Sequence, residues 1–157
     1  MLFDYEKHQN LWYLLAEHIS EAARGSYKGE GFYSGYSALE KLKRQLLQEY
    51  FPEEDRQIEN LCFACNAAVQ EEEDRDWHEP GSINCNYCPL RWPNGLQCDD
   101  NHSLYMHLID QLRFNNVSAA ADTCIAIANV RPFTDKEYEK KIPVQSVFHI
   151  WKSREVN

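Results

Sequence analysis

The sequence predicts a mainly α-helical fold, and two observations support this. Apolar side chains recur every three or four residues before residue 52 and again after residue 100, which is the spacing of one buried helix face. The 157 residues contain no internal repeat and no long linker, so we expect a single domain covering residues 1–157. The helical pattern is interrupted by a polar segment that holds five of the six cysteines.

The first half of the chain predicts two helices joined by a loop. The first helix ends at Gly25, and the loop from Gly25 to Tyr36 contains four glycines and four aromatic residues. The second helix begins at Ser37, where Ser37 and Glu40 form a capping box. The expected buried stripes are Leu11, Trp12, Leu15, Ile19 and Ala22 in the first helix, and Leu39, Leu42, Leu46, Leu47 and Tyr50 in the second.

Three cations of the second helix, Lys41, Lys43 and Arg44, are expected to lie largely off its stripe. A short helix is predicted from Pro52 to Leu61. The sequence leaves residues 66–70 open between strand and helix.

The second half of the chain predicts two further long helices and a short one. The third starts near residues 101–103, where Asn101 and Ser103 are plausible caps, and is broken at residues 115–116. The fourth spans residues 118–129 and a short helix follows at 134–141, whereas residues 143–151 are open between strand and helix. The expected stripe of the third helix is Leu104, Leu108, Ile109 and Leu112.

The polar segment contains two Cys-x2-Cys pairs separated by nineteen residues. A two-residue spacer lets both thiolates of a pair reach one tetrahedral ion, so this pattern is typical of a zinc site. We therefore expect a four-cysteine zinc-knuckle or zinc-ribbon-like element at about residues 58–100, inserted in the helical domain and holding one structural Zn²⁺. The predicted ligands are Cys62, Cys65, Cys85 and Cys88, and either Cys98 or His78 is a possible replacement for one of them.

Other uses of the cysteines remain open. The start of the chain lacks a basic region followed by an apolar run, and no stretch approaches the roughly 20 apolar residues of a membrane span. We therefore expect a reducing cytoplasmic setting, in which paired cysteines bind metals more often than they form disulfides. Disulfides, free thiols, an iron–sulfur cluster and redox chemistry are the alternatives. Cys124, in an alanine-rich segment, is predicted to be a small buried residue.

The net charge of −9 is concentrated around the cysteines. Residues 52–100 carry three basic and twelve acidic residues, whereas the segments on either side nearly balance. Such a surface repels nucleic-acid backbones and favours a basic protein partner.

Two sets of residues are candidates for binding a partner. The glycine-rich loop offers four aromatic side chains, although such a loop more often packs across helix ends. The acidic run offers four carboxylates, although such a run is more often only a solvated polar loop. The candidates are Tyr27, Phe32, Tyr33 and Tyr36 in the loop, and Glu71, Glu72, Glu73 and Asp74 in the run.

Several stretches resemble small zinc-binding proteins of unknown function that bacteriophages and prophages encode. Only the cysteine block is specific, but the similar positions span most of the chain. They are Leu11 to Ala16, Cys62, Cys65, Cys85 to Trp92, Cys98, Leu104 to Tyr105 and Ile125 to Asn129. The resemblance implies phage origin, a host-cytoplasm setting and a role in phage–host conflict, and it supplies no catalytic residues.

These observations favour a non-enzymatic, zinc-stabilised interaction protein that binds a host protein, such as a defence or regulatory factor. A nucleic-acid-binding zinc ribbon is one alternative, for which only the cluster Lys41 to Arg44 offers basic residues. A His-Asn-His-type nuclease is another, with His78 in the position of a catalytic histidine. Four thiolates close the coordination sphere that a hydrolytic metal needs open, which disfavours the nuclease.

Overall fold

The computed structural model describes residues 3–24, 32–55, 58, 62–75 and 85–141. These residues form helices and two 3-10 turns, and the one bridge of extended backbone among them pairs Leu90 with Pro132. The elements are α1 (Tyr5–Arg24), α2 (Phe32–Tyr50), α3 (Pro52–Asp55), α4 (Phe63–Arg75), η1 (Cys85–Tyr87), η2 (Pro93–Gly95), α5 (Leu104–Arg113), α6 (Val117–Ala128) and α7 (Asp135–Lys141). The predicted mainly helical fold is confirmed for this part of the chain, where no helix is long and apolar enough to cross a bilayer.

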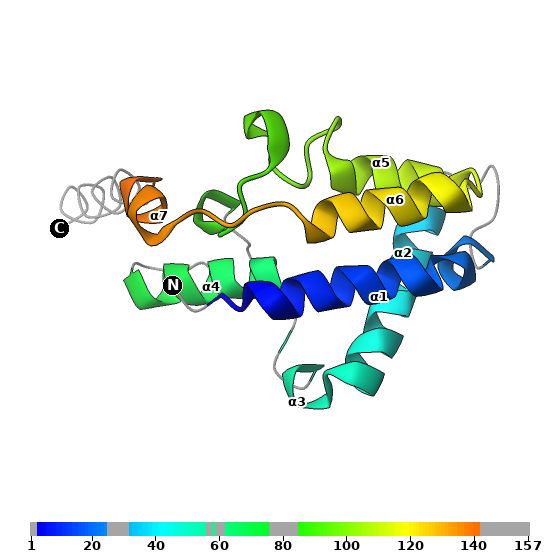
Figure 1. The fold of residues 1–157 in the computed structure, drawn as a ribbon, viewed down its shortest axis with the longest axis horizontal. Helices are drawn as coiled ribbons and strands as arrows, with labels where there is room; N and C mark the ends of the chain where they lie inside the picture. The colour runs from blue at the N-terminus through cyan, green and yellow to red at the C-terminus, as the bar shows by residue number, and fades with distance from the viewer. Residues whose placement is uncertain (1–2, 25–31, 56–57, 59–61, 76–84, 142–157) are drawn as a thin grey trace, which may run out of the picture.

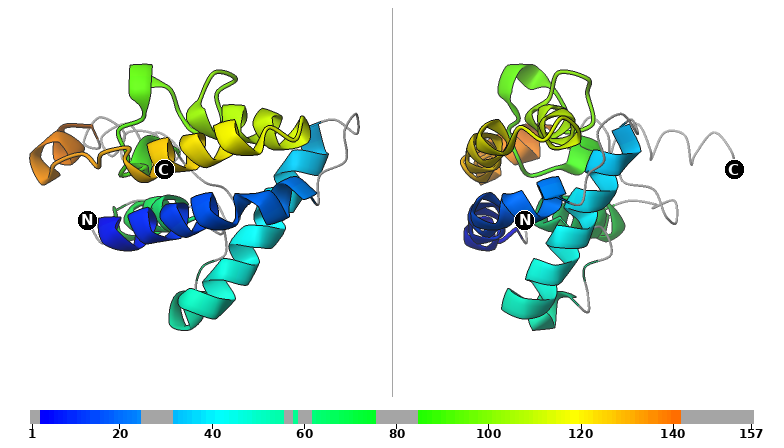
Figure 2. Two further views of the ribbon diagram at one scale, coloured as in Figure 1. Left: turned by 45° about the vertical axis from the view of Figure 1, so that its right-hand side comes forward. Right: turned by 90° about the vertical axis from the view of Figure 1, so that its right-hand side faces the viewer.

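Four helices enclose the main apolar cluster, which we call the helical core. Helix α1 lies beside α6, α2 crosses α1 obliquely, and α5 packs on both α6 and α2 (Figures 1 and 2). Fully buried side chains from all four helices meet here, among them Leu11, Leu15, Leu39, Leu47, Leu108, Ile109, Leu112 and Ile127. Cys124 is buried in the same cluster, as its sequence context predicts.

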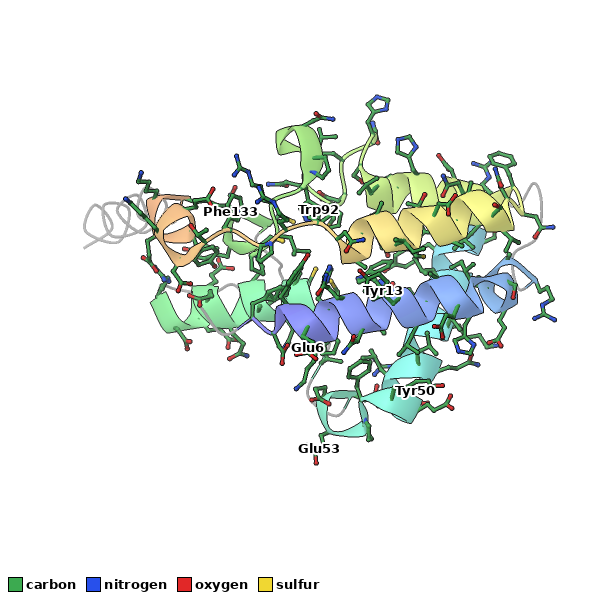
Figure 3. The ribbon with its side chains drawn as sticks, in the orientation of Figure 1. Glu6, Tyr13, Tyr50, Glu53, Trp92 and Phe133 are labelled. Carbon is green, nitrogen blue, oxygen red and sulfur yellow. The ribbon has the colours of Figure 1, made fainter. Side chains whose placement is uncertain are left out.

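The predicted stripes of α1 and α5 are confirmed, with Leu104 only partly buried, but two expectations for α2 are wrong. Tyr50 is 47% exposed at the end of α2 (Figure 3). Lys43 was expected largely off the stripe, yet its exposure is 2%. Position 43 is four residues from both Leu39 and Leu47, so helical geometry places it on the same buried face whatever its charge.

Helix α2 begins at Phe32, five residues before the predicted capping box, so the end of the predicted loop is helical. Gly35 explains why this turn packs closely on α5. A Cβ atom at position 35 would lie 2.5 Å from the carbonyl oxygen of Ile109, so only glycine fits without a shift of the backbone.

Short polar motifs set the ends of the later helices. The Ser103 side chain accepts a hydrogen bond from the Met106 amide and caps α5, as predicted. Asn115 ends α5 in the left-handed region with φ 57°, and Asn116 then caps α6. Before α7, Thr134 and Glu137 exchange side-chain and backbone hydrogen bonds of 3.1 Å, which form a capping box.

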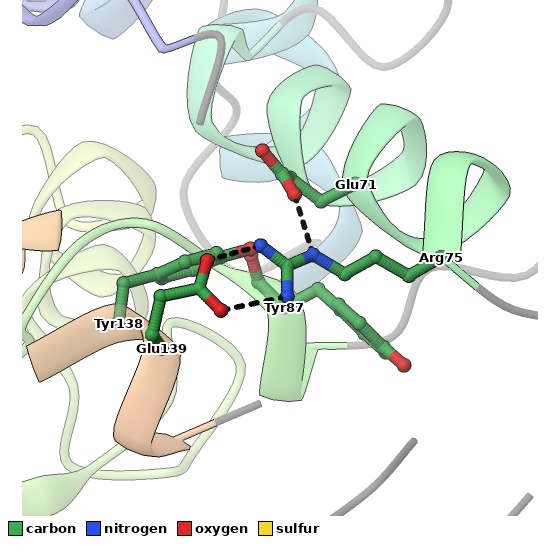
Figure 4. A network of polar contacts seen from close by, with 5 residues as sticks. All are labelled: Glu71, Arg75, Tyr87, Tyr138 and Glu139. Atoms are coloured by element: carbon green, nitrogen blue, oxygen red, sulfur yellow. Dashed lines mark hydrogen bonds and ion pairs between the residues drawn. The ribbon is translucent and has the colours of Figure 1, made fainter. Parts of the chain in front are cut away.

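A second region gathers near the N-terminal end of α1, and we call residues 62–75, which include α4, residues 85–103 and residues 129–141 the cysteine region (Figure 1). Residues 66–70, left open by the sequence, are helical in α4. Arg75 joins α4 to α7, since its guanidinium pairs with Glu71 and Glu139 and lies over the Tyr138 ring (Figure 4). The Tyr138 hydroxyl in turn donates a 2.7 Å hydrogen bond to the Tyr87 carbonyl in η1.

Candidate metal centre

The first pair of cysteines is positioned by the start of α4. Cys62 directly precedes the helix, and its carbonyl accepts the Asn66 amide at 3.0 Å. Cys65 lies in the first turn of the helix, so a single helical turn brings the two side chains close together. The Phe63 ring between them packs edge-on against Phe51, which ties this turn to the end of α2.

The second pair is positioned by η1 and by a short antiparallel contact. The Cys88 amide donates to the Cys85 carbonyl at 3.1 Å, which closes the 3-10 turn. Pro89 then prevents the turn from continuing as a regular helix. Residues 89–91 instead pair with residues 131–133 through two backbone hydrogen bonds of 2.8 and 2.9 Å.

A fifth cysteine comes from the turn before α5. The Cys98 carbonyl accepts a 2.6 Å hydrogen bond from the Ser103 hydroxyl, the same group that caps α5. Cys98 is therefore held in place by the start of a core helix.

These three segments bring five cysteines together around one cavity of about 410 Å³. Cys98 occupies a central place, because its thiol is hydrogen-bonded with those of Cys65 and Cys85, and Cys65 also contacts Cys62. The Cys85 and Cys98 sulfurs and a carboxylate oxygen of Asp99 all lie within 4.8 Å of one another and are near enough to bind a metal ion. All six cysteines are free thiols.

The thiols perturb one another strongly. Hydrogen bonds from Cys65 and Cys85 lower the pKa of Cys98 to about 3, and the hydrogen bond from Cys65 lowers the pKa of Cys62 to about 7. The pKa values of Cys65 and Cys85 are raised, first because their protons are held in these hydrogen bonds. Ionising all of these thiols together would place several negative charges side by side, which a bound cation would compensate.

Cys88 is held differently from the other four. Burial raises its pKa to about 11, and a hydrogen bond from the Leu90 backbone amide partly offsets this. The indole nitrogen of Trp92 is buried and has no hydrogen-bond partner within the described residues. A thiolate at Cys88 is an acceptor that would satisfy this donor.

The donor set fits a soft, tetrahedral ion. Thiolates select Zn²⁺ over Mg²⁺ or Ca²⁺, and a structural zinc site takes four ligands, which can all be thiolates. The predicted ligands Cys62, Cys65, Cys85 and Cys88 all line the cavity. Among the described residues, however, the group close enough to share a metal ion is Cys85, Cys98 and Asp99, so the predicted four-cysteine set is not assembled in this structure. The structure adds Asp99, which the sequence analysis did not consider although it adjoins Cys98.

Two further buried polar side chains line this cavity and were not identified as site residues in the sequence analysis. His8 is 1% exposed, and its Nε2 lies 3.0 Å from the Ile127 carbonyl, so Nε2 carries the proton. The His8 Nδ1 atom has no hydrogen-bond partner in the described part of the chain, and burial lowers the pKa of His8 to about 4. The other side chain is Lys43. Helical spacing alone could have predicted its position on the buried face of α2.

The candidate partner-binding residues fall into different environments. Tyr36 is 39% exposed, whereas Tyr27 and the side chains of Phe32 and Tyr33 lie outside the described residues. The acidic run was expected to be a polar loop, but it forms the last turns of α4. Glu73 and Asp74 are exposed there, while Glu71 and Glu72 are buried because they face the rest of the cysteine region.

The three basic residues considered for nucleic-acid binding lie in different environments. Lys41 is exposed, Lys43 is buried and Arg44 pairs with Asp55 at 2.5 Å, so these cations do not form one basic face. His78 lies outside the described residues.

Comparison with protein-family models, with curated proteins and with solved structures finds no match for this chain.

Proposed function

We propose that this chain is a zinc-stabilised protein that acts by binding another protein and has no catalytic centre of its own. The observation that carries the metal part is the meeting of five cysteine sulfurs from three separate segments around one cavity. Four of these sulfurs would hold a single Zn²⁺, with Cys62 and Cys65 from α4 and the others from η1 and the turn at Cys98. The ion would supply a structural cross-link between these segments.

The charge distribution supports the binding part. Residues 52–100 have a net charge of −9 from three basic and twelve acidic residues. A zinc ion with four thiolates would add about two further negative charges. We therefore propose a basic protein partner, attracted to the exposed carboxylates of Glu73 and Asp74 on α4.

The resemblance to phage-encoded zinc proteins extends this proposal to a host protein in the host cytoplasm, such as a defence or regulatory factor. Tyr36, exposed near the start of α2, is the alternative, aromatic candidate for contacting the partner.

Metal analysis of protein purified under reducing conditions tests the zinc centre. We expect about one zinc per chain in the wild type, and strongly reduced content in Cys62→Ser and Cys65→Ser. Cys124→Ala is the matched control, because Cys124 lies in the helical core and should not affect metal content. Metal-free wild type with disulfide-linked cysteine peptides would refute the centre.

Single Ser variants of Cys88 and Cys98 then identify the remaining ligands. Retention of the metal in Cys88→Ser with loss in Cys98→Ser would place Cys98 in the coordination sphere. Loss of the metal in Cys88→Ser with retention in Cys98→Ser would support the predicted ligand set of two Cys-x2-Cys pairs.

Affinity capture from a bacterial lysate, followed by mass spectrometry, tests the binding function. A genuine partner should bind the wild type and should bind the double variant Glu73→Ala/Asp74→Ala more weakly, with the difference shrinking as salt is raised. Metal-dependent cleavage of nucleic acid by the purified chain would instead support the nuclease alternative.

A further inference from the structure

Lys43 is an unusual residue in this fold, because its ammonium group is buried in the middle of α2. The Nζ atom lies 5.3 Å and 5.0 Å from the ring centroids of Trp12 and Tyr105. Its ion pair is with Glu40, whose Oε1 is 3.3 Å away. The same Glu40 oxygen also accepts a hydrogen bond from the Tyr105 hydroxyl at 3.2 Å.

One shared and partly exposed carboxylate is a weak counter-ion for a buried ammonium. The Glu40 side chain is 22% exposed and its distance to Nζ exceeds that of a strong charge-assisted hydrogen bond. Contacts with aromatic faces add attraction but no compensating charge. A buried cation normally requires more negative charge nearby than Glu40 supplies.

That charge is available across the cavity. Lys43 lines the same 410 Å³ cavity as the five cysteines and Asp99.

We propose that Lys43 is the buried counter-cation of a metal–thiolate centre, and that it strengthens metal binding by offsetting the negative charge of the thiolates. The inference rests on the proposed function, since it requires the metal. A divalent ion with four thiolates carries a charge of about −2, and the fixed ammonium reduces this to about −1. Glu40 then acts in the opposite sense, because its carboxylate competes with the centre for the lysine.

The test compares zinc affinities, measured by competition with a chelator, and the thiolate-to-metal absorption of the Co²⁺-substituted protein. Lys43→Met should weaken zinc binding about tenfold or more, because it removes the positive charge that offsets the thiolates. Lys43→Arg keeps the charge and should stay within about threefold of the wild type. Lys41→Met, on the exposed side of the same helix, is the control and should bind as the wild type does.

The Glu40→Gln variant separates a counter-cation from a residue that only stabilises the fold. If Lys43 serves the metal centre, removing the competing carboxylate should leave zinc affinity unchanged or raise it. If Lys43 serves only as a partner for Glu40, the Lys43→Met and Glu40→Gln variants should lose affinity together.

Wild-type affinity in Lys43→Met, or a parallel loss in Glu40→Gln, would overturn the inference. Should Lys43→Met fail to fold, the Glu40→Gln result alone decides, because the two readings predict different outcomes for it. Absence of thiolate-bound zinc or Co²⁺ in the wild type would refute the proposed function itself, which is a separate result.

Discussion

The helical core and the cysteine region are built by different means within one chain. The helical core buries leucine and isoleucine side chains from four helices in one cluster. Within the described residues, the cysteine region has two small clusters with three buried residues each, and its five thiols occupy the place that apolar side chains fill elsewhere. Apolar burial is extensive in the first region and small in the second, where the proposed metal cross-link would supply stability that apolar area does not.

Removing the metal should separate the two regions most clearly. Structural zinc contributes about 10–16 kcal/mol to the folding of zinc-finger peptides, so its loss is the largest effect that we expect. After chelation, hydrogen exchange followed by mass spectrometry should show lost protection in residues 62–75 and 85–100. Protection of α1 and α6 should persist. Equal loss of protection in both regions would show that the helical core depends on the metal as much as the cysteine region does.

Cavity formation in the helical core should have the next largest effect. Leu108 is completely buried between α5 and its neighbours, so Leu108→Ala should destabilise the protein by about 2–5 kcal/mol. Urea denaturation measures this, and the cost should be similar with and without metal. Phe114→Ala is the control, because Phe114 is 57% exposed and its loss should cost no more than about 0.5 kcal/mol.

Lowering the pH should weaken the contact between α1 and α6 through His8. The folded-state pKa of about 4 lies below the ordinary value of 6.5, so the unfolded chain binds the proton more readily. Stability should therefore fall by roughly 3 kcal/mol as the pH drops from 6.5 to 4. Denaturation curves of the wild type and of His8→Gln across this range isolate the effect, since the variant should show a smaller slope. Parallel slopes would contradict the burial of a neutral His8.

The smallest effect should come from the exposed side of α4. Glu73→Ala and Asp74→Ala should each change stability by no more than about 0.5 kcal/mol, because both side chains are exposed. Glu71→Gln is the matched comparison one turn earlier. It should cost about 1–3 kcal/mol, since Glu71 is buried and accepts a 2.9 Å hydrogen bond from Arg75. Similar changes in melting temperature for Glu71→Gln and for the two alanine variants would mean that the buried and exposed carboxylates of α4 do not differ in their contribution to stability.

Sequence periodicity predicted the helical core well because its helices place an apolar residue at each turn of the buried face, which is the pattern that the prediction assumes. Leu11, Leu15 and Ile19 in α1 are apolar at every buried turn, and the cap at Ser103 uses only local contacts. Lys43 and Glu71 were misplaced for the opposite reason. Each is a charged residue on a buried helix face, and each forms an ion pair one turn away in its own helix, Lys43 with Glu40 and Glu71 with Arg75.

The candidate site was predictable only in part. Cysteine spacing identified Cys62, Cys65, Cys85 and Cys88 as a group, because each pair is local in sequence. The positions of Cys98, Asp99 and His8 in the same cavity depend on how α1, α4 and α5 pack, and no short motif encodes that packing.

The hydroxyl of Ser103 has a consequence for how the two regions communicate. It donates to the Cys98 carbonyl at 2.6 Å and accepts the Met106 amide at 3.1 Å, so a single oxygen belongs both to the cysteine turn and to the first turn of α5. Displacing either turn disturbs the other. If the proposed zinc binds, a protein that displaces the start of α5 would change the zinc affinity, and zinc would change the affinity for that protein by the same factor. This coupling is reciprocal whether it is favourable or unfavourable.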